Sequence, residues 1–219
     1  NGISPIDSIN IKYFKKNKEK VSTNYFVLNQ ADIIVICLPT PLKSKNIPDL
    51  KYLDDCYKNL SKIDIKDKII ILESTVYPGV TKKLADQLVS KEKALIIGKN
   101  IFFGYSPERE NPGDKGFSYQ KTPKVISGYS KNCSKLMKRI YGSIAKKTYH
   151  CDTLEEAETS KLLENLYRSI NIGLANEMKL ICNKLGINVH SVIESAATKN
   201  FGFQKFIPGP GLGGHCIPI

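Results

Sequence analysis

The sequence lacks a hydrophobic stretch long enough to cross a membrane. Its longest apolar runs, such as residues 33–38, are far shorter than the ~20 residues that a membrane-spanning helix requires. The 219 residues contain no internal repeat and no low-complexity tract, and no signal-peptide pattern opens the chain, which does not begin with Met. With 41% hydrophobic and 25% charged residues, the sequence predicts a soluble globular protein without a membrane partner.

Paired cysteines are absent as well. The six cysteines form no C-x-x-C motif and no regular ladder, which indicates reduced thiols and predicts a cytoplasmic protein. Five of them lie in strand-like or helix-like stretches, where a small buried side chain is the default interpretation. Cys216 differs because four glycines and two prolines precede it within residues 208–214, a composition typical of a loop that approaches a ligand closely. The spacing leaves two alternatives for Cys216, a nucleophilic thiol and a structural one.

Aromatic residues are not interleaved with the many lysines. The formal net charge is +12, but the lysines are scattered along the chain. The charge therefore favours attraction of a small anionic substrate over nucleic-acid binding.

The glycines at 209, 211 and 214 spell G-x-G-x-x-G, a dinucleotide-binding pattern. That pattern has physical meaning only between a strand and a helix. Here residues 206–208 (Phe-Ile-Pro) precede it and Pro218 follows it. We therefore predict that this match is false.

Strand and helix patterns alternate up to about residue 150. The continuous apolar runs at 31–38 and 69–72 predict strands that are buried on both faces of a parallel sheet. The other expected strands are 94–97, 102–105 and 124–126, and the expected helices are 49–63, 81–89 and 133–145. This alternation predicts an α/β domain over residues 1–150, with a mainly parallel sheet and helices on both faces.

A long helix predicted over residues 154–185 begins a second, helical domain, residues 151–219. Thr153 is a good N-cap followed by acidic residues, and Gly186 supplies a left-handed stop. A second helix is expected at 189–197. A sheet domain followed by a helix of this length is typical of a connection between two domains.

Lys161, Asn165 and Arg168 share one face of the long helix, because they fall at i, i+4 and i+7. A solvated stripe is the simpler interpretation of such a face. Asn165 favours a functional face instead, because Asn is a poor helix former and exposed helix positions usually carry better ones. Asn171 and Asn176 are further asparagines in the same predicted helix.

Polar side chains also follow the predicted strands, at the edge where open α/β sheets bind ligands. These are Thr40, Glu73, Thr75 and Glu108. A carboxylate at this edge is a general base or, equally, a helix cap or an ion-pair partner. A hydroxyl there positions a ligand or a water molecule.

Five segments stand in order along the chain: 31–42 (ADIIVICLPTPL), 73–81 (ESTVYPGVT), 105–115 (YSPERENPGDK), 156–177 (EAETSKLLENLYRSINIGLANE) and 209–219 (GPGLGGHCIPI). Together they resemble the successive signatures of the UDP-glucose/GDP-mannose 6-dehydrogenases. The segment 105–115 is most similar to the bacterial branch that oxidises UDP-N-acetylglucosamine or UDP-N-acetylgalactosamine for capsule or O-antigen polysaccharides. The resemblance implies a Rossmann-like sheet followed by a mostly helical central domain.

The resemblance also implies a reaction, the NAD-dependent four-electron oxidation of the sugar C6 hydroxyl to a carboxylate. Cys216 would trap the intermediate aldehyde as a thiohemiacetal, and water would cleave the thioester that forms next. Lys161 and Asn165 would stabilise oxyanions at C6. Glu108 would be the general base for hydrolysis, and Thr75 would order the water.

Binding roles follow from the same resemblance. Thr40, Glu73 and Thr75 would lie against NAD, and no metal is expected. The helix 154–185 would build a homodimer. The residues expected to bind the UDP-sugar are Glu108, Arg109, Lys161, Asn165, Arg168, Phe206, Gly209, Gly211 and Gly213.

The sequence departs from the family pattern in three places. It starts after the expected strand and glycine-rich turn, Pro112 stands where UDP-glucose enzymes carry a second Glu, and the chain ends at Ile219, before an expected Asp and the C-terminal UDP-sugar domain. We therefore expect an internal fragment that is inactive by itself. The alternatives are a UDP-glucose 6-dehydrogenase, a non-catalytic dimerisation or binding module, and a thiol enzyme that does not use NAD.

Overall fold

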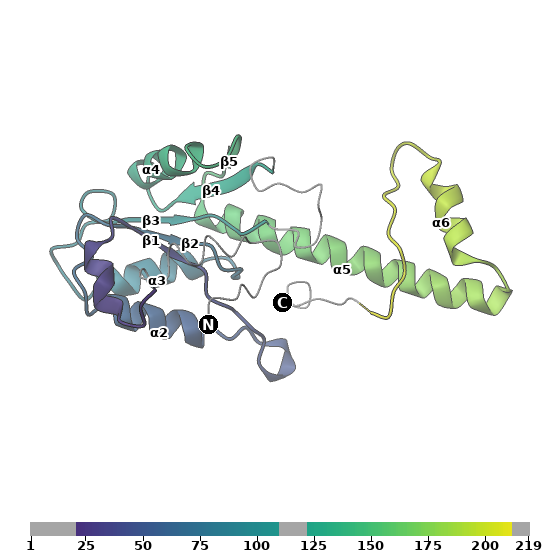
Figure 1. Ribbon diagram of the computed structural model, residues 1–219, viewed down its shortest axis with the longest axis horizontal. Helices are drawn as coiled ribbons and strands as arrows, with labels where there is room; N and C mark the ends of the chain where they lie inside the picture. Colours follow the sequence, from purple (N-terminus) through teal and green to yellow (C-terminus); the bar gives the residue numbers. More distant parts are fainter. Residues whose placement is uncertain (1–20, 110–121, 212–219) are drawn as a thin grey trace. The chain divides into compact units, whose positions relative to one another are not determined.

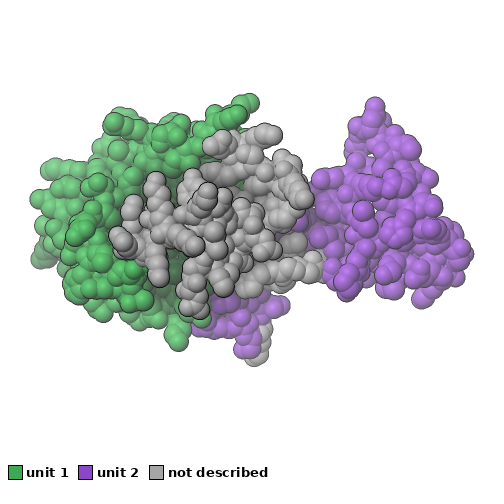
Figure 2. All heavy atoms as spheres, viewed as in Figure 1, with its two compact units in different colours: residues 1–40, 50–158 green, residues 41–49, 159–219 purple. Residues whose placement is uncertain are grey.

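The computed structural model describes residues 21–109 and 122–211 (Figure 1). The chain divides into two compact units, coloured separately in Figure 2. We call residues 1–40 and 50–158 the sheet unit, and residues 41–49 and 159–219 the helical unit. Within residues 41–49, a single bridge pairs Leu42 with Pro48, and a short 3-10 helix, η3, spans Ser44–Asn46.

The sheet unit contains five strands in the order β1-β2-β3-β4-β5. Their bounds are Ile33–Ile36 (β1), Ile69–Leu72 (β2), Phe102–Tyr105 (β3), Lys124–Gly128 (β4) and Thr148–His150 (β5). All neighbours pair in parallel except β3 and β4, which are antiparallel. The predicted mainly parallel sheet is therefore confirmed, although β5 was not anticipated.

The strand predicted at residues 94–97 is wrong. This segment forms turns, with one isolated bridge between Ile97 and Ile101. The side chain of Asn100 accounts for the difference, because it accepts from the Ile96 N–H at 2.7 Å and donates to the Ala94 carbonyl at 2.8 Å. Side-chain bonds of this kind satisfy the backbone locally and compete with a strand ladder.

The helices of the sheet unit lie on both faces of the sheet, as predicted (Figure 1). They are α2 (Lys51–Leu60), α3 (Val80–Val89) and α4 (Lys131–Gly142), and a 3-10 helix, η2, spans Tyr25–Gln30. Buried residues of α2 and α3 pack with Ile34, Ile70 and Phe103 in one cluster. Met137 of α4 packs with Ile71 in another, on the opposite face.

A glycine sets how closely α4 approaches the sheet, and one strand of the sheet is less buried than predicted. Gly104 in β3 leaves room for α4, since a Cβ at this position would lie 2.2 Å from the Met137 sulfur. The prediction that β1 is buried on both faces is wrong, because Ile33 and Val35 are 40% and 47% exposed. β1 is the edge strand of the described sheet. On this face, the residues that pack with α4 are Ile69 and Ile71 of the neighbouring strand β2, and not Ile33 and Val35 of β1.

The helical unit is built on α5 (Leu154–Leu185), which begins in the sheet unit and runs for 32 residues. A capping box starts it: the Glu156 N–H donates to Thr153 Oγ1 at 3.1 Å, and the Thr153 N–H donates to Glu156 Oε2 at 3.4 Å. Gly186 ends it with φ +68°. α6 (Val189–Ala197) follows, so both predicted helices are confirmed. None of the helices in residues 21–109 and 122–211 is long and apolar enough to cross a membrane.

Candidate functional site

The turns after β1 and β2 are joined to each other at the carboxyl edge of the sheet. The Thr40 hydroxyl donates to the Thr75 carbonyl oxygen at 2.6 Å, and the Ser74 hydroxyl donates to the Leu38 carbonyl oxygen at 2.6 Å. Thr40 is buried. Its hydroxyl therefore fixes the backbone of Thr75, and the structure brings together these two predicted cofactor-binding residues.

Glu73, directly after β2, is held by two side chains that the sequence did not indicate. The Tyr141 hydroxyl donates to Glu73 Oε1, and Lys124 Nζ lies 3.1 Å from the same oxygen. The Lys124 side chain is only 3% exposed, and its ammonium lies 5.5 Å from the centre of the Tyr141 ring. This network fixes the Glu73 carboxylate while leaving it 15% exposed at the edge. A lysine at the start of the apolar strand β4 is the one local signal that could have revealed it.

Glu108 and Arg109 follow β3 at the same edge. The Glu108 N–H donates to the Glu73 carbonyl oxygen at 3.4 Å, which places the two predicted carboxylates on adjacent turns. Arg109 Nη1 donates to the Pro123 carbonyl oxygen at 2.9 Å. This bond links the segment after β3 to the residue before β4.

Cys37 is an exposed thiol at the end of β1, near these groups. Burial of part of its surface raises the pKa of the Cys37 thiol, and the negative charge of Glu73 adds to the shift. The positive charge of Lys124 opposes it. The thiol is thus kept protonated, unlike a nucleophilic cysteine, whose pKa is lowered by its surroundings.

Lys161 and Asn165, on α5, are both buried, with 9% of their surface exposed. A solvated stripe is therefore excluded for these two residues. Arg168, predicted on the same face, is exposed. A buried cation and a buried amide one helical turn apart are suited to stabilising negative charge on an oxygen atom.

Two of the predicted sugar-binding residues are tied to α5 within the helical unit. The Gly209 N–H donates to Asn176 Oδ1 at 2.9 Å, which accounts for an asparagine at this helical position. The Phe206 and Tyr167 rings pack edge to face, with their centres 5.9 Å apart. Gly211 is exposed, and Gly213 and Cys216 lie outside the described residues.

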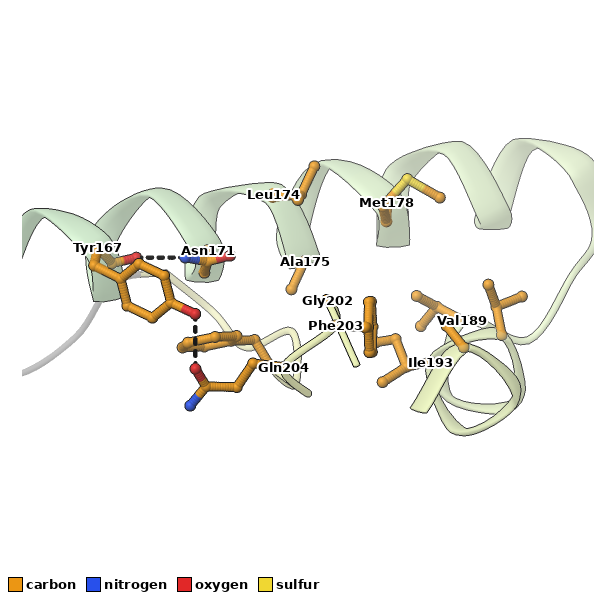
Figure 3. Close-up of a pocket in the computed structure, with 13 residues that line it drawn as sticks. Tyr167, Asn171, Leu174, Ala175, Met178, Val189, Ile193, Gly202, Phe203 and Gln204 are labelled. Carbon is orange, nitrogen blue, oxygen red and sulfur yellow. Dashed lines mark hydrogen bonds between the residues drawn. The ribbon is translucent and has the colours of Figure 1, made fainter. Parts of the chain in front are cut away.

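A pocket of about 770 Å³ lies between α5, α6 and residues 202–206 (Figure 3). Its lining is mostly apolar and includes Leu174, Met178 and Phe203. At one end the Tyr167 hydroxyl donates to Gln204 Oε1 at 2.7 Å. Phe206 lines this pocket, whereas Lys161 and Asn165 do not. Such a lining does not suit a sugar diphosphate, so we do not place the chemistry here.

Comparison with known proteins gives two matches to family models. Residues 6–145 match the NAD binding domain of the UDP-glucose/GDP-mannose dehydrogenase family, and residues 155–219 match its central domain. The chain belongs to the UDP-glucose/GDP-mannose dehydrogenase family. Residues 6–145 therefore correspond to the NAD-binding domain of these dehydrogenases, and residues 155–219 correspond to their central domain.

Two of the relatives described next are named for an acetylated amino sugar. The chain is 37% identical to protein CapL of Staphylococcus aureus over 94% of its length, and 36% identical to UDP-N-acetyl-D-glucosamine 6-dehydrogenase of Pseudomonas aeruginosa over 88%. These matches cover 48% and 45% of the two relatives, so the chain spans about half their length. The structure of UDP-D-ManNAc dehydrogenase from Pyrococcus horikoshii is also similar, with a TM-score of 0.90 and 31% sequence identity. The match covers 100% of this chain and 53% of the Pyrococcus chain.

The groups at the carboxyl edge fit the NAD that the family binds. Glu73 presents a partly exposed carboxylate, an acceptor for ribose hydroxyls, and its orientation is fixed by Lys124 and Tyr141. The joined turns at Thr40 and Thr75 add backbone groups at the ends of parallel strands. Among the described residues, no group of three or more His, Cys, Asp or Glu side chains could hold a metal ion.

Proposed function

We propose that the whole protein is a UDP-N-acetylhexosamine 6-dehydrogenase, which oxidises the C6 hydroxyl of its sugar to a carboxylate for capsule or O-antigen polysaccharides. The observation that carries the proposal is the buried pair Lys161 and Asn165 at the start of the central domain of a NAD-binding dehydrogenase. The names of two relatives support the choice of an acetylated amino sugar.

In the proposed mechanism, NAD⁺ held at Thr40, Glu73 and Thr75 would supply the oxidant for each of two oxidations at C6. Cys216 adds its sulfur to the aldehyde, and the second oxidation converts the thiohemiacetal into a thioester. Lys161 and Asn165 stabilise the oxyanion at C6 at each stage. Glu108 removes a proton from the water that cleaves the thioester, and Thr75 orders that water. Cys216 leaves as the free thiol.

Different residues are assigned to the cofactor and to the sugar. Thr40, Glu73 and Thr75 would hold NAD at the strand ends. The tether between Gly209 and Asn176 supports a role of residues 209–213 in wrapping the sugar with backbone amides. We place the enzyme in the cytoplasm as a homodimer built on α5.

The test is an assay of the full-length protein for NADH formation with UDP-N-acetylglucosamine, its galacto and manno epimers, and UDP-glucose. We expect turnover with an acetylated sugar and, for Cys216→Ala, a fall in kcat on the order of 10³-fold or more. The matched control is Cys182→Ala, since Cys182 packs against Val189 and Ile193 in the helical unit, and it should retain activity.

Each alternative predicts a different result. Turnover with UDP-glucose alone would assign the protein to the UDP-glucose branch. A non-catalytic module would form no NADH with any sugar. Activity that survives complete removal of NAD would indicate a thiol enzyme of another kind.

A further inference from the structure

Glu158, in the second turn of α5, is a fully buried carboxylate with three hydrogen-bond donors. Its Oε2 accepts from the Gly79 N–H at 2.6 Å. Its Oε1 accepts from the Thr81 N–H at 2.9 Å and from the Thr81 hydroxyl at 2.6 Å. The exposed fraction of Glu158 is 0%. A buried carboxylate is tolerated only when it is hydrogen-bonded in this way.

The donors belong to the start of α3, which has no cap of its own. Gly79 occupies the N-cap position with φ +92° and has no side chain to accept from the first turn of the helix. The first N–H groups of a helix need acceptors, and the positive end of its dipole favours an anion. Glu158 supplies both functions from 77 residues further along the chain. The first turns of α5 thereby cap α3.

This cap joins the two elements that carry the proposed reactive groups. The turn that ends at Gly79 begins after β2 and includes Thr75, whose carbonyl oxygen is bonded to Thr40. On α5, Lys161 and Asn165 follow Glu158 at i+3 and i+7 and share its helical face. A shift of Glu158 would therefore disturb both the start of α3, where the turn that contains Thr75 ends, and the helical turn of α5 that precedes Lys161.

We propose that Glu158 is a positioning residue of the dehydrogenase reaction. It holds the first turns of α5, from which Lys161 and Asn165 follow, to the start of α3 at the end of the turn that contains Thr75. It touches neither the cofactor nor the substrate. This inference rests on the proposed function.

Both oxygens of Glu158 are acceptors, which makes Glu158→Gln an informative substitution. The glutamine keeps the size of the side chain but turns one acceptor into an NH₂ group that faces an N–H donor. We expect kcat of the full-length enzyme to fall about 10- to 100-fold, because small misplacements of catalytic groups have effects of this size. The KM for NAD should change much less. Thr81→Val removes one of the three donors and should lower kcat in the same direction, by a smaller factor.

The matched control is Ser130→Ala, which removes the side-chain cap of another helix in the same unit. The Ser130 hydroxyl oxygen accepts from the Cys133 N–H at 3.3 Å at the start of α4. Both variants should lower the melting temperature, but only Glu158→Gln should lower kcat per folded molecule. The folded fraction is measured by circular dichroism at the assay temperature.

A double-mutant cycle with Asn165→Ala separates positioning from loss of stability. If Glu158 acts through the α5 groups, Glu158→Gln should lower kcat much less in the Asn165→Ala background than in the wild type. Equal fold-losses in the two backgrounds, or a kcat for Glu158→Gln no lower than that of Ser130→Ala, would overturn the proposal. A wild-type enzyme that oxidises no UDP-sugar would instead refute the proposed function itself, and the positioning role with it.

If Glu158→Gln does not fold, the kcat of Thr81→Val tests the positioning role of Glu158 instead. A kcat reduced per folded molecule, with a smaller reduction in the Asn165→Ala background, supports the positioning role. A kcat equal to the wild-type value contradicts it.

Discussion

Glu73 and Lys124 form a buried ion pair, and its effect on stability differs from that of a surface pair. Their atoms lie 3.1 Å apart, and the Lys124 side chain is 3% exposed. The pair of Lys43 and Asp49 has a similar separation, 3.2 Å, but the Lys43 side chain is 58% exposed. Water screens the second pair and not the first, so comparing them isolates the contribution of burial.

We predict that Glu73→Gln lowers the free energy of unfolding by about 3 kcal/mol, because it removes the negative charge facing a buried ammonium group. Asp49→Asn, the control, should change it by less than about 1 kcal/mol. Urea unfolding at neutral pH measures both. The double variant Glu73→Gln, Lys124→Met should lose less than the sum of the two single variants. Equal losses of unfolding free energy for Glu73→Gln and Asp49→Asn would contradict the prediction that burial increases the cost of breaking the pair of Glu73 and Lys124.

At the residue scale, the sequence indicated where the carboxylates and hydroxyls lie but not what holds them. Thr40, Glu73 and Thr75 were placed correctly because the ends of parallel strands meet at one edge. Lys124 and Tyr141 reach Glu73 through β4 and α4, whose arrangement depends on an antiparallel pairing that no local pattern specifies. Glu158 was missed for the same reason, since its partners lie 77 and 79 residues away.

At the scale of elements, α5 was predictable and β1 was only partly so. The ends of α5 are set by local signals, a capping box at Thr153 and a left-handed glycine at 186. The burial of β1 depends instead on its neighbours in the sheet, so its apolar run did not reveal that one face is exposed. Residues 94–97 were mistaken for a strand because a nearby asparagine satisfies their backbone.

The opposite side of α5 from Lys161 and Asn165 is apolar and exposed. Leu163, Ile170 and Leu174 are 63%, 60% and 59% exposed. Their spacing of seven and four residues keeps them on one stripe, half a turn around the helix from the buried polar pair. A helix with a reactive face and an apolar face suits the proposed homodimer, in which two copies of the stripe would meet.

We predict that Ile170→Lys weakens the proposed homodimer of the full-length protein about 100-fold, because it would place an ammonium group in an apolar contact. Asn183→Lys, on the opposite side of α5 and also exposed, is the control and should leave the dimer intact. Sedimentation velocity over a range of concentrations measures the dissociation constant. A dimer that is unaffected by Ile170→Lys would place its interface elsewhere.

At the scale of the whole molecule, several polar contacts join elements that lie far apart in the sequence. The sheet forms from local apolar patterns, and α5 forms from its own caps. The cap that Glu158 provides to α3, by contrast, exists only after the sheet unit has folded. The titration of this carboxyl therefore links the stability of the folded protein to pH.

Burial raises the pKa of Glu158 above its ordinary value; the three donors oppose this shift, and the nearby charge of Glu155 adds to it. The folded state therefore binds a proton at a pH where the unfolded chain has already lost it. Stability from this group rises as the pH falls through the raised pKa, and the effect is complete below the ordinary glutamate pKa of about 4.3. Above the raised pKa the carboxyl is ionised in the folded state, and burying its charge lowers the stability of the fold.

A glutamine at position 158 does not titrate, so comparing the wild type with Glu158→Gln isolates the contribution of the Glu158 carboxyl to the pH dependence of stability. We predict that the unfolding free energy of the wild type, relative to Glu158→Gln, increases as the pH is lowered from about 7 towards about 4.5. Urea unfolding of both proteins at several pH values measures the difference, and the titrations of all other groups cancel in it. If the wild type instead loses stability relative to the variant, the donors from Gly79 and Thr81 outweigh burial, and Glu158 holds α3 and α5 together more strongly as an anion.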